Sequence, residues 1–103
     1  MGYNIAMGYE IEKTVQFDNW LKKLRDRRAV LAIVQRLNRA ALGNLGDTKA
    51  LGDGVYEMRL FLGPGYRLYY TLRDDIIILL LIGGDKSSQK KDIRLAQKIA
   101  ASL

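Results

Sequence analysis

Polar and apolar residues alternate along two neighbouring stretches in the middle of the chain, residues 55–62 and 66–72. An apolar side chain at every second position is the pattern of a strand with one buried face. The short Gly-Pro-Gly connection at residues 63–65 favours an antiparallel hairpin between the two stretches. On the face opposite the apolar one, the hairpin would carry Glu57, Arg59, Arg67 and Tyr69. Because these polar groups are concentrated rather than scattered, that face is a candidate anion site.

A second period, with apolar residues every three to four positions, predicts helices over residues 17–24, 30–41 and 93–103. The expected signals at their ends are Asp18 as the first N-cap, a break at residues 26–28, a stop at Gly43-Asn44, and Ser87 or Ser88 as the last N-cap. The polar face of the first two helices carries Lys22, Lys23, Arg25, Arg27, Arg28, Arg36 and Arg39, which we expect to be solvated.

The remaining stretches complete the fold. Residues 9–16 alternate weakly, as an edge strand does, and residues 49–51 favour a short strand. Residues 76–82 are apolar on both faces, which predicts an inner strand covered on both sides, followed by a turn at residues 83–86. The order is one strand, two helices, three or four strands depending on residues 49–51, and a helix; with three it reads β-α-α-β-β-β-α. This order predicts one α+β domain over residues 9–103, with a small, mainly antiparallel sheet, two N-terminal helices and a C-terminal helix. Residues 1–8 show no period and are expected to form a flexible extension.

Composition narrows the chemistry. The 103 residues suffice for one domain. They include no Cys, which excludes disulfides and thiol nucleophiles, and no His, which excludes the usual metal ligand and the usual general base. We therefore expect neither a metal nor a cofactor. The net charge of +6 favours a polyanion such as nucleic acid, or an acidic protein, as partner. No signal-peptide pattern or membrane-length apolar run is present, which predicts a cytoplasmic protein without membrane contact.

The candidate anion site extends beyond the hairpin. Lys86 follows the expected inner strand, at the start of the last helix. If that strand lies beside the hairpin, Arg59, Arg67 and Lys86 converge on a shallow basic cleft, for which phosphate is the natural ligand. A simpler interpretation stays open, in which Glu57 and Arg59 form a surface ion pair and Lys86 is a solvated charge.

A phosphate-binding cluster of this kind also fits metal-free cleavage of RNA by attack of a 2′-hydroxyl on the adjacent phosphate. The reaction needs a proton acceptor, stabilisation of the phosphorane and a proton donor. Arg67 and Arg59 are the candidate stabilisers, and Glu57 or a lysine of lowered pKa is the candidate base. Contacts to RNA are expected from Tyr69, by stacking on a base, and from Arg73, Lys90 and Lys91.

Several short sequence words occur in the order found in a known family, at residues 20–21, 36–39, 43–47, 54–59, 63–70 and 83–93. The last two, which begin Gly-Pro-Gly-Tyr-Arg and Gly-Gly-Asp-Lys-Ser-Ser, are the more specific together. Through them the chain, from Tyr9 to Leu103, resembles the phage-type HigB branch of the RelE/ParE toxin superfamily, the addiction module killer proteins.

The resemblance implies a RelE-like fold and the toxin of a type II toxin–antitoxin system. Such a toxin inhibits translation as a ribosome-dependent mRNA endoribonuclease in the ribosomal A site, without a metal. It is neutralised in a toxin–antitoxin hetero-oligomer by a co-encoded antitoxin, commonly a helix-turn-helix protein. By position, Arg67 matches the family's arginine after Gly-Tyr, Arg59 matches a basic residue of the preceding strand, and Lys86 matches a second arginine beyond the inner strand.

This chain departs from the family at two places. Where RelE-like enzymes carry a Tyr and other HigB proteins a His, it reads Lys90-Lys91-Asp92, and Glu57 and Arg59 replace paired lysines. The general base and acid therefore stay unassigned, with Glu57 and Lys91 as candidates to assist. Two alternatives remain: a ParE-like inhibitor that binds DNA gyrase without cutting RNA, and a degenerate RNA-binding module.

Overall fold

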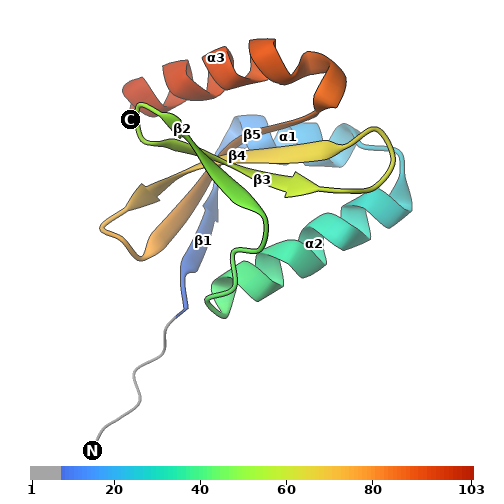
Figure 1. Ribbon diagram of the computed structural model, residues 1–103, viewed down its shortest axis with the longest axis horizontal. Coiled ribbons are helices and arrows are strands. Elements are labelled where there is room, and N and C mark those ends of the chain that lie inside the picture. Colours follow the sequence, from blue (N-terminus) through green and yellow to red (C-terminus); the bar gives the residue numbers. More distant parts are fainter. Residues whose placement is uncertain (1–7) are drawn as a thin grey trace, which may run out of the picture.

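The computed structural model describes residues 8–103, so the expected extension at residues 1–8 lies outside it apart from Gly8. The described residues form a sheet flanked by helices (Figure 1). In chain order the elements are β1 (Glu10–Lys13), α1 (Val15–Lys23), α2 (Arg27–Ala41), β2 (Thr48–Gly52), β3 (Val55–Leu60), β4 (Tyr66–Arg73), β5 (Ile77–Asp85), the 3₁₀ turn η1 (Lys86–Ser88) and α3 (Gln89–Ala101).

The strands lie in the order β1-β5-β4-β3-β2. Only β1 and β5 pair in parallel, and the other neighbours are antiparallel. The predicted α+β fold is therefore confirmed, including the β3–β4 hairpin. In its register Glu57 lies opposite Tyr69, and Arg59 lies opposite Arg67.

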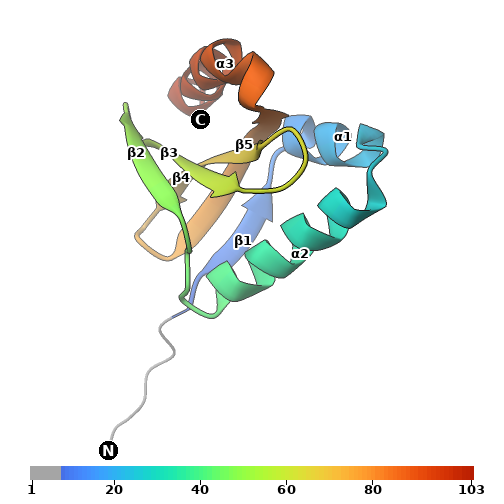
Figure 2. The ribbon, with the colours of Figure 1, turned by 45° about the vertical axis from the view of Figure 1, so that its right-hand side comes forward.

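Helices cover both faces of the sheet, with α2 and α3 on opposite sides (Figure 2). Phe17 of α1 and Ile33 of α2 join a core made with the apolar face of the hairpin. Ala96 and Ile99 of α3 join a second core on the other face. Residues of β5 contribute alternately to the two cores, as its double apolar pattern predicts.

The first helix starts earlier than predicted. Its N-cap is Thr14 and not Asp18, because the Thr14 hydroxyl accepts a hydrogen bond from the Phe17 N–H at 3.0 Å and donates one to the Leu81 carbonyl at 2.8 Å. One side chain thus caps α1 and ties it to β5. A break before α2 is confirmed, but it lies at residues 24–26 and not at 26–28, because Asp26 caps α2 by accepting hydrogen bonds from the Arg28 and Ala29 N–H groups.

Arg36 is not part of the solvated helix face, and its expected exposure is wrong. The side chain is 8% exposed, and its guanidinium donates hydrogen bonds to the carbonyls of Leu45, Asp47 and Arg59 at 2.7–3.1 Å. These carbonyls need donors, because the chain between α2 and β2 lies against β3 there. Arg36 thereby fixes that connection.

The predicted turn at residues 83–86 is also wrong, because β5 continues to Asp85 and pairs Gly83 with Leu68 and Gly84 with Arg67. A Cβ on Gly83 would lie 2.2 Å from the ring of Trp20. On the opposite face, a Cβ on Gly84 would overlap the carboxylate of Asp92. The glycines therefore allow α1 and α3 to approach the strand closely from its two sides.

Candidate functional site

Glu57 and Arg67 form an ion pair beneath the first turn of α3. Glu57 is 1% exposed, and its Oε1 lies 3.5 Å from Nε of Arg67 and accepts a hydrogen bond from Nε2 of Gln89 at 2.9 Å. Because a buried carboxylate is stable only when paired, these contacts explain why Glu57 tolerates burial. The face predicted to be open is therefore partly covered by α3.

Arg67 and Lys86 meet at the β3–β4 connection. Nη1 of Arg67 donates a hydrogen bond to the Gly65 carbonyl at 3.0 Å, and the Lys86 N–H donates one to the Pro64 carbonyl at 3.4 Å. A Cβ on Gly65 would lie 3.4 Å from the guanidinium of Arg67 and 3.6 Å from Cβ of Lys86. The guanidinium of Arg67 and the first side-chain carbon of Lys86 therefore both lie beside Gly65.

The segment that carries Lys86 is held in place by hydrogen bonds around Asp85. The Asp85 carboxylate accepts bonds from the Ser87 N–H at 2.9 Å and from the Ser87 hydroxyl at 2.5 Å. These bonds lower the pKa of Asp85, with a smaller contribution from the charge of Arg67. Ser88 donates to the Asp92 carboxylate, which fixes the first turn of α3 against Gly84.

A basic hollow of about 410 Å³ lies at the start of α3, on this same segment. Its lining contains no carboxylate and supplies four cationic side chains, which favours an anionic ligand such as phosphate. The residues around it are Lys86, Ser87, Ser88, Gln89, Lys90, Lys91 and Arg94.

Arg59 lies opposite Arg67 in the hairpin and forms an ion pair with a different carboxylate, that of Asp47. Its Nη2 lies 3.1 Å from Oδ1 of Asp47, and this hydrogen bond raises the pKa of Arg59. Two arginines side by side on adjacent strands would repel one another. Because Glu57 and Asp47 each neutralise one of them, the structure keeps both cations in adjacent positions.

Two residues predicted to contact RNA are misplaced for that role. Tyr69 is fully buried beneath α3, so its prediction as a stacking residue is wrong; burial, followed by the charge of Glu57, raises the pKa of its hydroxyl. Arg73 lies at the opposite end of β4 from Arg67, opposite Ile77, and pairs with Glu12 at 3.4 Å. Lys86, Lys90 and Lys91 line the basic hollow. Arg59 and Arg67 do not line it but lie opposite each other on the hairpin, with the buried Glu57 paired to Arg67.

No model of a known protein family matches the chain. An uncharacterized protein of Haemophilus influenzae is 43% identical over 97 residues, which cover 94% of this chain and 98% of that protein. The chain belongs to the family of this Haemophilus protein.

Two solved structures define its fold more closely. A mutant of the Escherichia coli toxin RelE in the free state superposes with a TM-score of 0.70 at 17% identity, over 89% of this chain and 98% of that one. A chain of the RelBE2 toxin–antitoxin complex of Mycobacterium tuberculosis matches with a TM-score of 0.62 at 24% identity, over 77% and 99%. The chain therefore has the RelE fold.

Phe61 is a further candidate site residue that the sequence patterns did not lead us to predict. Its side chain is 82% exposed at the β3–β4 connection, and the guanidinium carbon of Arg59 lies 5.8 Å from the centre of its ring. The alternation offered a signal, because position 61 falls with Glu57 and Arg59 on the polar side of the strand pattern. An aromatic ring at a polar, exposed position beside an arginine is a candidate contact for a nucleobase.

Gln89 and Asp47 were also missed. They hold Glu57 and Arg59 from segments distant in the sequence, so no local pattern could identify them. Within residues 8–103, no group of three or more potential acidic or sulfur metal ligands lies together. Within the same residues, no helix is long and apolar enough to cross a membrane.

Proposed function

We propose that this chain is the toxin of a type II toxin–antitoxin system, of the phage-type HigB branch, and that it cleaves mRNA in the ribosomal A site. The observation that carries the proposal is the placement of Arg67 against Arg59 and Lys86 on a RelE fold. The proposal includes a cytoplasmic location, where the ribosomal substrate is.

The proposed reaction is transesterification. The 2′-oxygen of one ribose attacks the adjacent phosphorus, the bond to the 5′-oxygen breaks, and the products are a 2′,3′-cyclic phosphate and a 5′-hydroxyl. Arg67 and Arg59 stabilise the extra negative charge of the phosphorane, and Lys86 binds the phosphate or returns a proton to the 5′-oxygen. The exposed amine of Lys91 is the nearby candidate to assist in accepting the 2′-hydroxyl proton.

Burial supports a different role for Glu57 from that of a base in contact with RNA. With its Oε1 engaged by Arg67 and Gln89, the carboxylate is placed to orient the guanidinium of Arg67. We therefore assign Glu57 as a positioning residue. Phe61 takes the stacking role that the buried Tyr69 does not fill.

The proposed partner is a co-encoded antitoxin, commonly of helix-turn-helix type in the branch that the sequence resembles. The presence of a similar chain in the RelBE2 toxin–antitoxin complex supports a partner of this kind.

Inducible expression followed by genome-wide mapping of mRNA 5′ ends tests the proposal. We expect growth arrest with cleavage phased to codons, and loss of both when Arg67 is changed to Ala. Arg73→Ala is the matched control, because it removes the same residue type from the same strand outside the cluster. Intact mRNA together with DNA damage would instead indicate a gyrase inhibitor.

The role of Phe61 has its own test. Phe61→Leu removes the aromatic face and keeps an apolar side chain, so we expect single-stranded RNA to bind about tenfold more weakly, whereas Phe61→Trp retains binding. Fluorescence anisotropy with a labelled oligonucleotide measures both. Equal affinity of the Leu and Trp variants would remove Phe61 from the substrate site.

A further inference from the structure

A hollow of about 220 Å³, which we call the α2–Phe61 hollow, lies between α2 and the β3–β4 connection. Ala32, Gln35, Arg36 and Arg39 of α2 form one side of it, and residues 60–62, at the end of β3 and just beyond, form the other. Because pockets for drug-sized ligands have roughly 300–1,000 Å³, this hollow suits a single planar ring system rather than a larger ligand.

Phe61 gives the hollow an aromatic wall beside the residues proposed for RNA cleavage. Arg59 lies over the Phe61 ring, with its guanidinium carbon 5.8 Å from the ring centre, and Phe61 is nevertheless 82% exposed. One face of the ring therefore remains accessible for stacking. A base on that face would bring its own phosphate close to Arg59.

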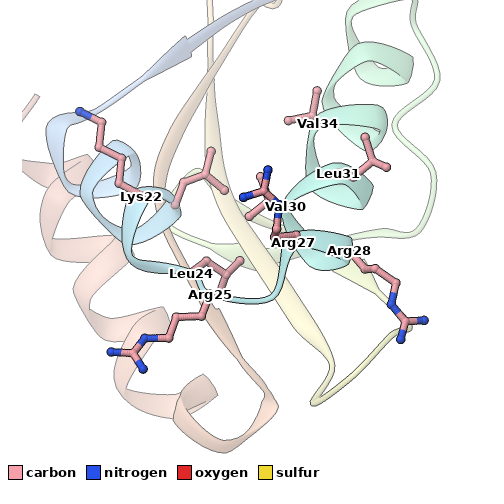
Figure 3. Close-up of a pocket in the computed structure, with 9 residues that line it drawn as sticks. Lys22, Leu24, Arg25, Arg27, Arg28, Val30, Leu31 and Val34 are labelled. Atoms are coloured by element: carbon pink, nitrogen blue, oxygen red, sulfur yellow. The ribbon is translucent and has the colours of Figure 1, made fainter.

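A larger hollow, of about 780 Å³ between α1 and α2, is lined differently (Figure 3). Its lining consists of aliphatic and cationic side chains such as Arg28, Val30 and Leu31, with no aromatic ring on which a base could stack. Of these two hollows, only the smaller one offers a stacking surface.

The buried guanidinium of Arg36 brings fixed hydrogen-bond donors to the α2–Phe61 hollow. Of its five N–H groups, three donate to backbone carbonyls, which leaves two without an acceptor within residues 8–103. Gly46 packs against the same guanidinium, since a Cβ there would lie 2.7 Å from Nε of Arg36. A buried donor without an acceptor is unfavourable, so a ligand that supplies an acceptor gains free energy here.

Gln35 and Arg39 add exposed polar groups one helical turn apart on the same side of the hollow. Among residues 8–103, Arg39 takes part in no ion pair. Burial, followed by the charge of Arg39, lowers the pKa of Arg36, so the two cations act on one another. No carboxylate lines the hollow. A ligand that fits must therefore offer acceptor atoms to the cationic side and a flat face to Phe61.

These two requirements discriminate between the four bases of RNA. Guanine carries two adjacent acceptors, O6 and N7, on the edge that arginine reads with two parallel hydrogen bonds. On the corresponding edge, adenine replaces one acceptor with an amino donor, cytosine presents an amino donor, and uracil has the single acceptor O4. The donor-rich side of the hollow therefore complements guanine best.

We propose that the α2–Phe61 hollow is a guanine subsite for a nucleotide beside the phosphate that is cleaved. The base stacks on Phe61, the guanidinium groups of Arg39 and Arg36 donate to its O6 and N7, and Gln35 lies beside the same edge. The subsite rests on the proposed function for its purpose. Its groups on α2 contact the base and not the reacting atoms, so its test is a binding measurement.

The probe is a fluorescently labelled RNA of about eight nucleotides, with uridine at every position except one in the centre. Its 2′-hydroxyls are methylated, which prevents cleavage during the measurement. Fluorescence anisotropy with the full chain compares guanosine, inosine, adenosine and 7-deazaguanosine at the central position.

Guanosine and inosine both carry O6 and N7, so we expect them to bind at least about tenfold more tightly than adenosine. In 7-deazaguanosine a carbon replaces N7, so most of this advantage should be lost although the ring still stacks. Equal affinities for the four oligonucleotides, or binding of 7-deazaguanosine as tight as that of guanosine, would overturn the proposal.

Arg39→Gln and Arg27→Gln are matched variants, because both change an exposed arginine of α2 and only Arg39 lines the α2–Phe61 hollow. Arg39→Gln should reduce the preference for guanosine over adenosine to below about twofold, whereas Arg27→Gln should retain it. A loss of charge that weakens every oligonucleotide equally does not change this ratio. An unchanged preference in Arg39→Gln, or an equal loss in Arg27→Gln, would contradict the assignment.

The binding assay also separates the subsite from the proposed function. Guanosine preference in a chain that leaves mRNA intact in cells would refute the cleavage and keep the subsite. Cleavage in cells that Arg67→Ala abolishes, without guanosine preference in the binding assay, would refute the subsite alone.

Discussion

The two faces of the sheet bury different kinds of side chain. Beneath α1 and α2 the core is built from aliphatic and aromatic residues such as Phe17, Ile33 and Leu68. Beneath α3 the buried residues include two carboxylates, Glu57 and Asp92, together with the hydroxyl of Tyr69. The first face is mainly an apolar core, with Arg36 as its buried charge, whereas the second is partly a polar layer that supports Arg67.

The two faces of the sheet therefore contribute different properties to the domain. An apolar face gains free energy in any arrangement that fills its volume, so it contributes mainly stability. Buried charges are stable only in the geometry that pairs them, so they also fix the positions of the groups they pair with. In this fold the site lies on the side where geometry is specified by charge.

The largest effect on stability should come from the apolar face. Ile33 is fully buried, and Ile33→Ala is expected to lower the free energy of unfolding by about 2–5 kcal/mol, measured by urea denaturation. The folded fraction should keep its rate of RNA cleavage, because α2 contributes no catalytic group. A folded Ile33→Ala protein without activity would remove the distinction between the faces.

The opposite outcome is expected for Glu57→Gln. The amide keeps the size of the side chain but loses the charge that orients Arg67, so kcat should fall about 100-fold with KM unchanged. Some loss of Tm is also expected, because the mostly buried Arg67 loses its partner. Single-turnover cleavage of ribosome-bound mRNA measures the rate. A rate equal to that of the original protein would mean that Glu57 is only a structural partner.

A third effect concerns how α3 is seated. The Cβ of Gly84→Ala would overlap the Asp92 carboxylate, which should cost about 1–3 kcal/mol of stability. Because the clash is with one side chain, the double variant Gly84→Ala, Asp92→Ala should be more stable than the sum of the two single changes predicts. Additive losses in thermal denaturation would show that the contact is relieved some other way.

Tyr69 and Tyr70 are neighbours on β4 and belong to the cores on opposite faces of the sheet, so the loss of one hydroxyl group can be compared between the faces. Tyr70 shares a 2.6 Å hydrogen bond with Thr48, so Tyr70→Phe should cost about 1 kcal/mol. Within residues 8–103 the Tyr69 hydroxyl makes no hydrogen bond of good geometry, and the charged group that acts on it most strongly is the Glu57 carboxylate, so Tyr69→Phe should cost less than Tyr70→Phe. Chemical denaturation of both variants checks the contrast, which equal losses would contradict.

The smallest effect is a pH dependence at Asp85. Hydrogen bonds from Ser87 lower its pKa in the folded state, so the carboxylate stabilises the fold above 3.8, the ordinary pKa, and this contribution is lost as the pH falls through the folded-state pKa. The difference in Tm between the original protein and Asp85→Asn should therefore shrink in acid. A difference that stays constant from neutral to acid pH would assign the effect to something other than this charge.

The sequence predicted the strands better than the site. Alternation placed Glu57, Arg59 and Arg67 on one face of the hairpin, and a run apolar on both sides identified β5, because both patterns are local. Gly83 and Gly84 were predicted to form a turn, because glycine pairs are common in turns. Here glycine is required since a Cβ would overlap Trp20 or Asp92, which are brought close only by the fold.

Burial was the harder property to predict. Tyr69 appeared available to RNA because the position of α3 over its face is not encoded near β4. Arg36 appeared solvated because its three carbonyl partners lie 9 to 23 residues away along the chain. Phe61 carried a local signal, an aromatic residue in the polar register, that predicted an unusual role and was missed.

The central claim is that the polar layer beneath α3 holds Arg67 as the principal stabiliser in RNA cleavage. Its most direct test is the single-turnover rate of cleavage of mRNA in the A site of programmed ribosomes, with purified Arg67→Ala beside the matched control Arg73→Ala. The expected result, per folded molecule, is a loss of at least about 100-fold for Arg67→Ala and a change of less than about twofold for Arg73→Ala. Arg67→Ala should also lower Tm, because it leaves the buried Glu57 carboxylate without its cation. Equal rates for the two folded variants would contradict the claim.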